Sequence, residues 1–176
     1  MHVLAQRPPL RTVGLAQSGL TWALDPDLLL FVPFWNLDGT VFLSQDAYGR
    51  TCTRTGATPG GQGAWVFDGT DDYLTVPASV DWNFTADFTI AVWANFDSVN
   101  RNLVKSVSNQ DWNSASSWDW LLNVGSDNHI YFYIKGSIIA DGGAVQTVAA
   151  ATWTHIAVAR VGSTVSVYKN AVLGGT

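Results

Sequence analysis

The chain contains no glutamate: its 14 acidic residues are all aspartates, and only three of its nine basic residues are lysines. Glutamate and lysine are typical of exposed helix surfaces, so their scarcity argues against a helical protein. The single cysteine, Cys52, excludes an internal disulfide. The net charge of −5 argues against nucleic-acid binding, which needs a cationic face. The sequence therefore favours a strand-rich protein without a nucleic-acid partner.

Long hydrophobic runs are also missing. The longest apolar run, residues 28–35, is too short to span a bilayer, which predicts no membrane span. The first 24 residues have neither a continuous apolar stretch nor an Ala-x-Ala cleavage site, so no signal peptide is visible. The 176 residues are 47% apolar and 13% charged, which excludes a disordered chain and allows one domain with its own core.

Short apolar segments separated by turn residues predict an all-β protein. Residues 87–96 alternate most cleanly, with apolar side chains at every second position from Phe88 to Phe96. About ten short strands and no convincing helix indicate a β-sandwich or barrel. Besides 87–96, the predicted strands are residues 28–34, 64–67, 73–76, 103–107, 118–124, 130–134, 144–148, 153–160 and 165–169, and one helical turn is predicted near 79–83.

The predicted domain organisation has two parts. Residues 1–27 have mixed polarity and no clear period, and they close on Asp25-Pro26-Asp27, which is typical of an N-terminal arm. The arm is interpreted either as a disordered terminus or expression remnant, or as a segment that binds a partner. Residues 28–176 are predicted to form the domain.

Several stretches in this domain resemble laminin-G-like, concanavalin-A-like jelly-roll domains. Residues 66–77 (VFDGTDDYLTVP) resemble the most recognisable motif of that family. Residues 83–93 (NFTADFTIAVW), 153–160 (WTHIAVAR) and 168–172 (YKNAV) follow in the family's order. The opening stretches 28–34, 46–50 and 55–57 also resemble its first strand and loops. The resemblance implies a jelly-roll antiparallel β-sandwich of the concanavalin-A-like lectin and glucanase type.

The sequence departs from this family pattern at two places. Ala171 stands where the family has glycine, and a left-handed backbone there would cost alanine about 1 kcal/mol. The family also continues past this hairpin with closing strands, whereas this sequence stops at Gly174-Gly175-Thr176. We therefore expect a C-terminally incomplete jelly roll. Either the chain is truncated, or a neighbouring subunit completes the sheet.

Catalysis is not expected. Enzymes of this fold that cut polysaccharides use a clustered pair of glutamates, and this chain has none. It also lacks the G-x-S-x-G nucleophile elbow. Its histidines, at positions 2, 129 and 155, are too scattered to predict a zinc site, and His155 is interpreted as a packed structural residue. Cys52 is interpreted as a small buried hydrophobe.

One acidic stretch suggests a metal site. Calcium prefers several hard oxygen ligands from a turn, and Asp68, Asp71 and Asp72 with nearby carbonyls would supply them. The alternative is a hairpin loop whose aspartates bond their own backbone amides. Calcium is the only cofactor that the sequence suggests.

A polar stretch suggests a ligand-binding loop. Trp112 lies between Asp111 and Asn113, and Trp118 follows, so an indole could stack on a sugar while polar neighbours bind its hydroxyls. Alternatively, Trp112 folds back and caps the sandwich edge. Four further tryptophans are predicted to lie in the core: Trp65, Trp93, Trp120 and Trp153.

Two functions follow as hypotheses. The first is a non-catalytic binding or adhesion module that recognises a glycan or protein surface, on a virion or cell surface. The second is a structural particle component, such as a phage decoration or tail protein, that acts through homo-oligomers or virion neighbours that complete its sheet. Fold alone does not decide between them.

Overall fold

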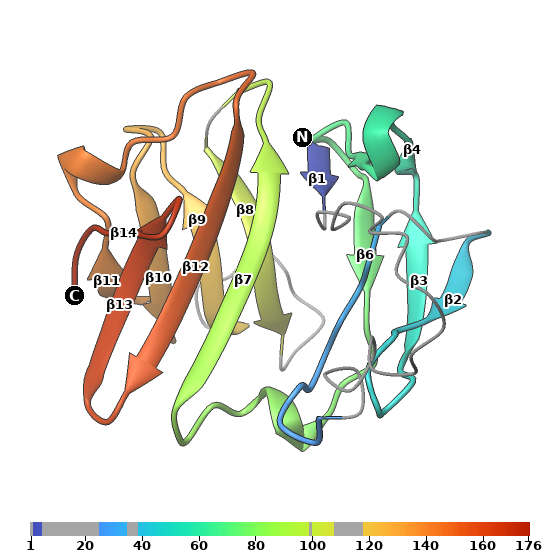
Figure 1. The fold of residues 1–176 in the computed structure, drawn as a ribbon, viewed down its shortest axis with the longest axis horizontal. Helices are drawn as coiled ribbons and strands as arrows, with labels where there is room; N and C mark the ends of the chain where they lie inside the picture. Colours follow the sequence, from blue (N-terminus) through green and yellow to red (C-terminus); the bar gives the residue numbers. More distant parts are fainter. Residues whose placement is uncertain (1, 5–24, 35–38, 99, 108–117) are drawn as a thin grey trace, which may run out of the picture. The chain divides into compact units, whose positions relative to one another are not determined.

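The structure is a computed structural model that describes residues 2–4, 25–34, 39–98, 100–107 and 118–176 (Figure 1). These residues form antiparallel strands and short 3-10 turns, which confirms the all-β prediction. No helix in the described ranges is long and apolar enough to cross a membrane. The chain divides into two compact units, residues 2–77 and 78–176, and each is described by itself.

Unit 78–176 contains two antiparallel sheets of four strands. In one, the order is β14 (Val172–Leu173), β13 (Thr164–Lys169), β12 (Trp153–Val161) and β7 (Phe88–Asn95). In the other, it is β11 (Ser137–Asp141), β10 (Ile130–Ile134), β9 (Trp118–Val124) and β8 (Arg101–Val107). Six of these strands begin and end within two residues of the prediction, because alternation specifies strands well.

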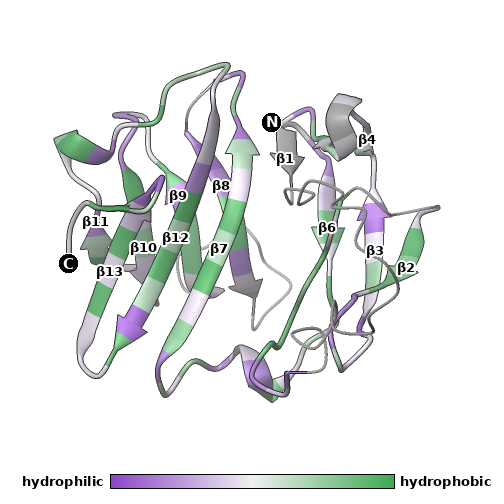
Figure 2. Ribbon diagram, in the orientation of Figure 1, coloured by the Kyte–Doolittle hydropathy of each residue, from purple (hydrophilic) through white to green (hydrophobic). Residues whose placement is uncertain are grey.

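The core of this unit lies between its two sheets. Green hydrophobic bands alternate with paler ones along β7, as the sequence predicted (Figure 2). An aromatic stack joins the sheets: the Phe84 ring lies 4.6 Å from Phe88 and 5.0 Å from Trp120, and Phe88 lies 5.7 Å from Phe132. The fully buried core side chains include Phe96, Leu122, Ile130, Phe132, Ile156, Val158 and Val167. The unit is therefore a β-sandwich.

Two tryptophans predicted in the core lie elsewhere. Trp93 and Trp153 are only half-buried, because the inward positions of their strands belong to residues such as Ala94 and Ile156. Trp93 instead packs against the ring of His155 at 5.2 Å between ring centres. His155 is thus a packed residue on an outer face, and burial lowers its pKa. Trp65 and Trp120 are buried as predicted.

Residues 144–148 do not form the predicted strand. They contain a 3-10 turn, Ala144–Gln146, entered through Gly143 at φ 61°. Gln146 is fully buried, and its Nε2 donates a hydrogen bond of 2.7 Å to the carbonyl of Val172. The predicted helical turn near residue 80 is present as Val80–Trp82, capped by Ser79. At the 168–172 hairpin, Ala171 adopts the left-handed φ of 66° that the sequence implied.

Unit 2–77 contains two sheets of three strands. One has the order β1 (His2–Leu4), β5 (Trp65–Val66) and β4 (Thr58–Pro59). The other has the order β2 (Val41–Leu43), β3 (Thr51–Thr55) and β6 (Tyr73–Thr75). Strand β1 belongs to the stretch interpreted as an arm. Cys52 on β3 is fully buried as predicted, and burial raises its pKa to about 11.

Residues 28–34 do not form the predicted strand: residues 28–33 have no regular secondary structure, and Phe34 lies in a turn. Side chains satisfy part of the backbone of this segment: the amide of Phe31 donates to Asp46 Oδ2 at 2.8 Å, and Arg50 Nε donates to the carbonyl of Leu29 at 3.0 Å. Pro33 lacks an amide hydrogen, which also disfavours a ladder here. Apolar character alone therefore misidentified this segment.

The prediction that residues 68–72 form a hairpin loop is also wrong. Strand β5 pairs with β1 and β4, whereas β6 pairs with β3, so the loop connects two different sheets. The amide of Asp68 donates to Asp72 Oδ2 at 2.8 Å, which closes the loop through a side chain instead of a strand ladder. The acidic residues consequently lie in the connection between two sheets.

Candidate functional site

The acidic loop, Asp68, Asp71 and Asp72, brings its three carboxylates together as the calcium hypothesis requires. One oxygen from each lies within 4.8 Å of the others. Calcium binds oxygens at about 2.3–2.6 Å, so ligands on opposite sides of the ion lie about 5 Å apart. Asp68 and Asp71 are exposed, and Asp72 is half-buried. The spacing fits calcium.

The same carboxylates also bond their own loop backbone, which was the alternative interpretation. Asp68 Oδ1 accepts hydrogen bonds from the amides of Thr70 at 2.7 Å and Asp71 at 3.3 Å. The bond from Thr70, with those from the following residues, lowers the pKa of Asp68. These bonds pre-form the loop and keep Asp68 ionised, so backbone bonding and a metal are compatible.

The position of Asp72 depends on the absence of a side chain at Gly56. Gly56 has φ +74°, and a Cβ at this position would lie 1.7 Å from Asp72 Oδ1 and 2.8 Å from its Cγ. Only glycine therefore allows the carboxylate to approach the backbone here. Asp72 therefore owes its position to the turn that follows β3 as well as to its own loop.

The predicted ligand loop is only partly placed. Asp111, Trp112 and Asn113 lie outside the described residues. Trp118 begins β9, but its side chain is not among those the structure describes. Contact between Trp112 and a ligand stays a prediction.

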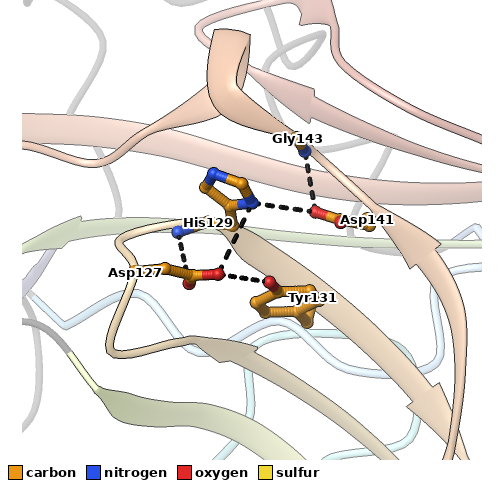
Figure 3. Close-up of polar contacts among 5 residues, drawn as sticks. All are labelled: Asp127, His129, Tyr131, Asp141 and Gly143. Atoms are coloured by element: carbon orange, nitrogen blue, oxygen red, sulfur yellow. Dashed lines mark hydrogen bonds and ion pairs between the residues drawn. The ribbon is translucent and has the colours of Figure 1, made fainter.

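A second polar cluster, absent from the predicted sites, lies in unit 78–176 (Figure 3). His129 Nδ1 lies 3.6 Å from Asp127 Oδ2 and 3.4 Å from Asp141 Oδ1. The hydroxyl of Tyr131 donates to Asp127 Oδ2 at 2.5 Å, and the amide of Gly143 donates to Asp141 Oδ1 at 2.7 Å. The imidazole thus stands between two carboxylates from different elements.

The electrostatics of this cluster follow from its short hydrogen bond. Donation to Asp127 raises the pKa of Tyr131, because ionising the phenol would break that bond beside a negative charge. The same bond lowers the pKa of Asp127. Both carboxylates are accessible, with 48% of the Asp127 and 44% of the Asp141 side chain exposed. The cluster therefore offers charged acceptors held by neighbouring groups.

The sequence alone indicates which residues of β10 share a face with His129, but not that Asp141 joins them. His129, Tyr131 and Tyr133 occupy alternate positions, which places them on one face of β10, while Ile130 and Phe132 point into the core. Asp141 joins them because β11 pairs with β10, with Tyr131 opposite Asp141. Such a register is not visible in a single sequence.

The family model described as the Concanavalin A-like lectin/glucanases superfamily matches residues 68–176, more than half of the chain. The protein therefore belongs to this superfamily, as its β-sandwich and its sequence motifs suggested. Neither the curated proteins nor the solved structures gave a match.

Proposed function

We propose that this protein is a non-catalytic binding module that recognises a glycan or protein surface, on a virion or a cell surface. The proposal depends above all on the absence of glutamate from a member of a superfamily that includes lectins and glucanases. Cleavage of a glycosidic bond needs one carboxyl as acid and another as base or nucleophile. Without the glutamate pair, recognition is the function that this fold retains.

The charge state of the carboxylates supports this proposal. A general acid must stay protonated near neutral pH, which requires a raised pKa. Hydrogen bonds from Thr70 and from Tyr131 instead lower the pKa values of Asp68 and Asp127. These two groups suit binding better than proton donation.

The test is to incubate the full chain with polysaccharides and to measure both reducing ends and retention on immobilised glycans and cell-surface proteins. Retention without release of reducing ends is expected. Release of sugars at an enzymatic rate would contradict the proposal, and so would a chain that retains no ligand.

Trp112→Ala tests the predicted loop. We expect ligand binding to be abolished and the melting temperature to stay nearly unchanged, because the loop indole would contact ligand and not the core. Calorimetry and thermal unfolding of the same sample measure both. A loss of several kcal/mol of stability, the usual cost of truncating a buried aromatic, would show that Trp112 caps the sandwich.

We also propose that the acidic loop binds calcium. Saturation at about 100 times the dissociation constant adds about 2.7 kcal/mol, so a chelator should lower the melting temperature by roughly 5–10 °C. Asp71→Asn, at an exposed ligand, should abolish the shift, whereas Asp25→Asn outside the loop should not. An unchanged melting temperature in chelator would end the calcium hypothesis.

Exposed apolar residues on strands β11 and β14 favour the second function, a particle component. Ile138 is 55% exposed, and Val172 and Leu173 are 63% and 51% exposed. Each of these strands is an edge strand of a four-stranded sheet in unit 78–176, and an edge strand can pair with a strand of another chain. Light scattering with electron microscopy separates the two functions. Ordered oligomers or filaments indicate assembly, and a stable monomer indicates ligand recognition.

A further inference from the structure

The outer face of strands β9, β10 and β11 combines aromatic rings with polar groups. In register across it, Asp141 on β11 lies opposite Tyr131 on β10, and Tyr131 lies opposite Asn123 on β9. The next outward position on β10 is Tyr133, whose ring centre lies 5.8 Å from that of Tyr131. Together with Asp127 and His129, these residues are called the β10 outer face below.

The groups on this face are already held in place. Tyr131 is tied to Asp127 by the 2.5 Å hydrogen bond, and the Gly143 amide fixes Asp141 Oδ1. His129 lies between the two carboxylates, and its ring centre is 6.0 Å from that of Tyr131. A ligand would therefore meet ordered acceptors and rings, which reduces the entropic cost of binding.

Two buried polar atoms of the face, Nδ1 of His129 and Oδ1 of Asn123, have no hydrogen-bond partner among the described residues. The Oδ1 atom of Asn123 is buried and accepts no hydrogen bond from any residue that the structure describes. A buried acceptor without a donor is costly, and an ordered water commonly supplies the missing donor. Asn123 lies opposite Tyr131 in the β9–β10 register.

We propose that the β10 outer face is a binding site for a neutral glycan. This inference rests on the proposed binding function and specifies its site and ligand class. A pyranose ring would stack its C–H face on Tyr131 and Tyr133. Its hydroxyls would donate to the exposed carboxylates of Asp127 and Asp141, as the few well-placed polar groups of a binding site require.

The charges around the face favour a neutral ligand. Two exposed carboxylates repel sulfated or sialylated glycans. Lys105 on β8 adds one positive charge to the same sheet, opposite Leu121, the neighbour of Tyr133 on β9. Neutral hydroxyls need acceptors and rings, and this face supplies both.

The test is a glycan array that contains neutral hexose oligosaccharides, sialylated glycans and sulfated glycans, followed by calorimetry with the best neutral oligosaccharide. We expect the full chain to bind neutral glycans. Tyr131→Ala and Asp141→Asn should each weaken binding at least tenfold, the scale of one hydrogen bond to a charged group. Tyr168→Ala is the matched control, since Tyr168 is a half-buried, outward-facing tyrosine on β13 and its loss should leave affinity unchanged.

Asp141→Asn keeps the test decisive if Tyr131→Ala fails to fold, because Asp141 is exposed. Binding restricted to anionic glycans or to a basic peptide would overturn the inference. If a neutral glycan binds and is lost in Trp112→Ala but not in Tyr131→Ala or Asp141→Asn, the binding function stands and the site is elsewhere. If no glycan binds but a protein surface does, only this inference fails, whereas absence of any ligand ends both.

Discussion

Replacement of Phe132 by alanine is expected to lower the free energy of unfolding by about 3–5 kcal/mol, the usual cost of removing a buried aromatic. Phe132 on β10 is fully buried in the core between the two sheets of its unit. Its ring lies 5.7 Å from Phe88 on β7 and 6.3 Å from Trp120 on β9. The substitution therefore removes contacts to both sheets and leaves a cavity.

Urea denaturation of the wild type and the variant measures this loss directly. Val145→Ala is a suitable control, because Val145 is 73% exposed and its truncation should change stability by less than about 0.5 kcal/mol. A loss below about 1 kcal/mol for Phe132→Ala would contradict the packing described between β7, β9 and β10.

Gly175→Ala is expected to destabilise the protein by about 1–3 kcal/mol, the range for forcing extra volume into a packed site. A Cβ on Gly175 would lie 1.8 Å from the backbone carbonyl oxygen of Asp141. Backbone atoms cannot rotate aside as a side chain can, so the segment at Gly175 must move away from β11. The hydrogen bond of 3.0 Å from the Val167 amide to the Gly175 carbonyl would then weaken or break.

Gly61→Ala is the matched control, because a Cβ there meets no atom within 4 Å. Its stability should stay close to that of the wild type, whereas Gly175→Ala should show an earlier thermal transition. Equal melting temperatures for the two variants would mean that residue 175 does not pack against Asp141. Since Asp141 also belongs to the β10 outer face, the same pair of variants should be included in glycan-binding assays.

Local patterns predicted much of the sandwich and failed where hydrogen bonds come from distant side chains. The sequence pattern located β9 and β10 to the residue. The segment 28–34 has the apolar character of a strand but bonds Asp46 and Arg50. Residues 144–148 were misjudged because Gln146 turns inward to the carbonyl of Val172.

In the acidic loop, too, the sequence indicates only part of the geometry. Asp68, Asp71 and Asp72 are so close in sequence that their proximity could be predicted from the loop alone. Their mutual geometry could not be predicted in this way. Asp72 lies against Gly56, which follows β3, and β5 and β6 belong to different sheets. The β10 outer face was not predicted at all.

By itself, the sequence determined the strand-rich class, the superfamily motifs and the absence of glutamate, since composition and period-two patterning are local properties. The tertiary structure alone decided which strands pair and which polar groups meet. Asp127 and Tyr131 are neighbours along one segment, but Asp141 reaches His129 only through the register of β10 with β11. Register depends on burial and backbone pairing across the whole sheet, so no short stretch of sequence encodes it.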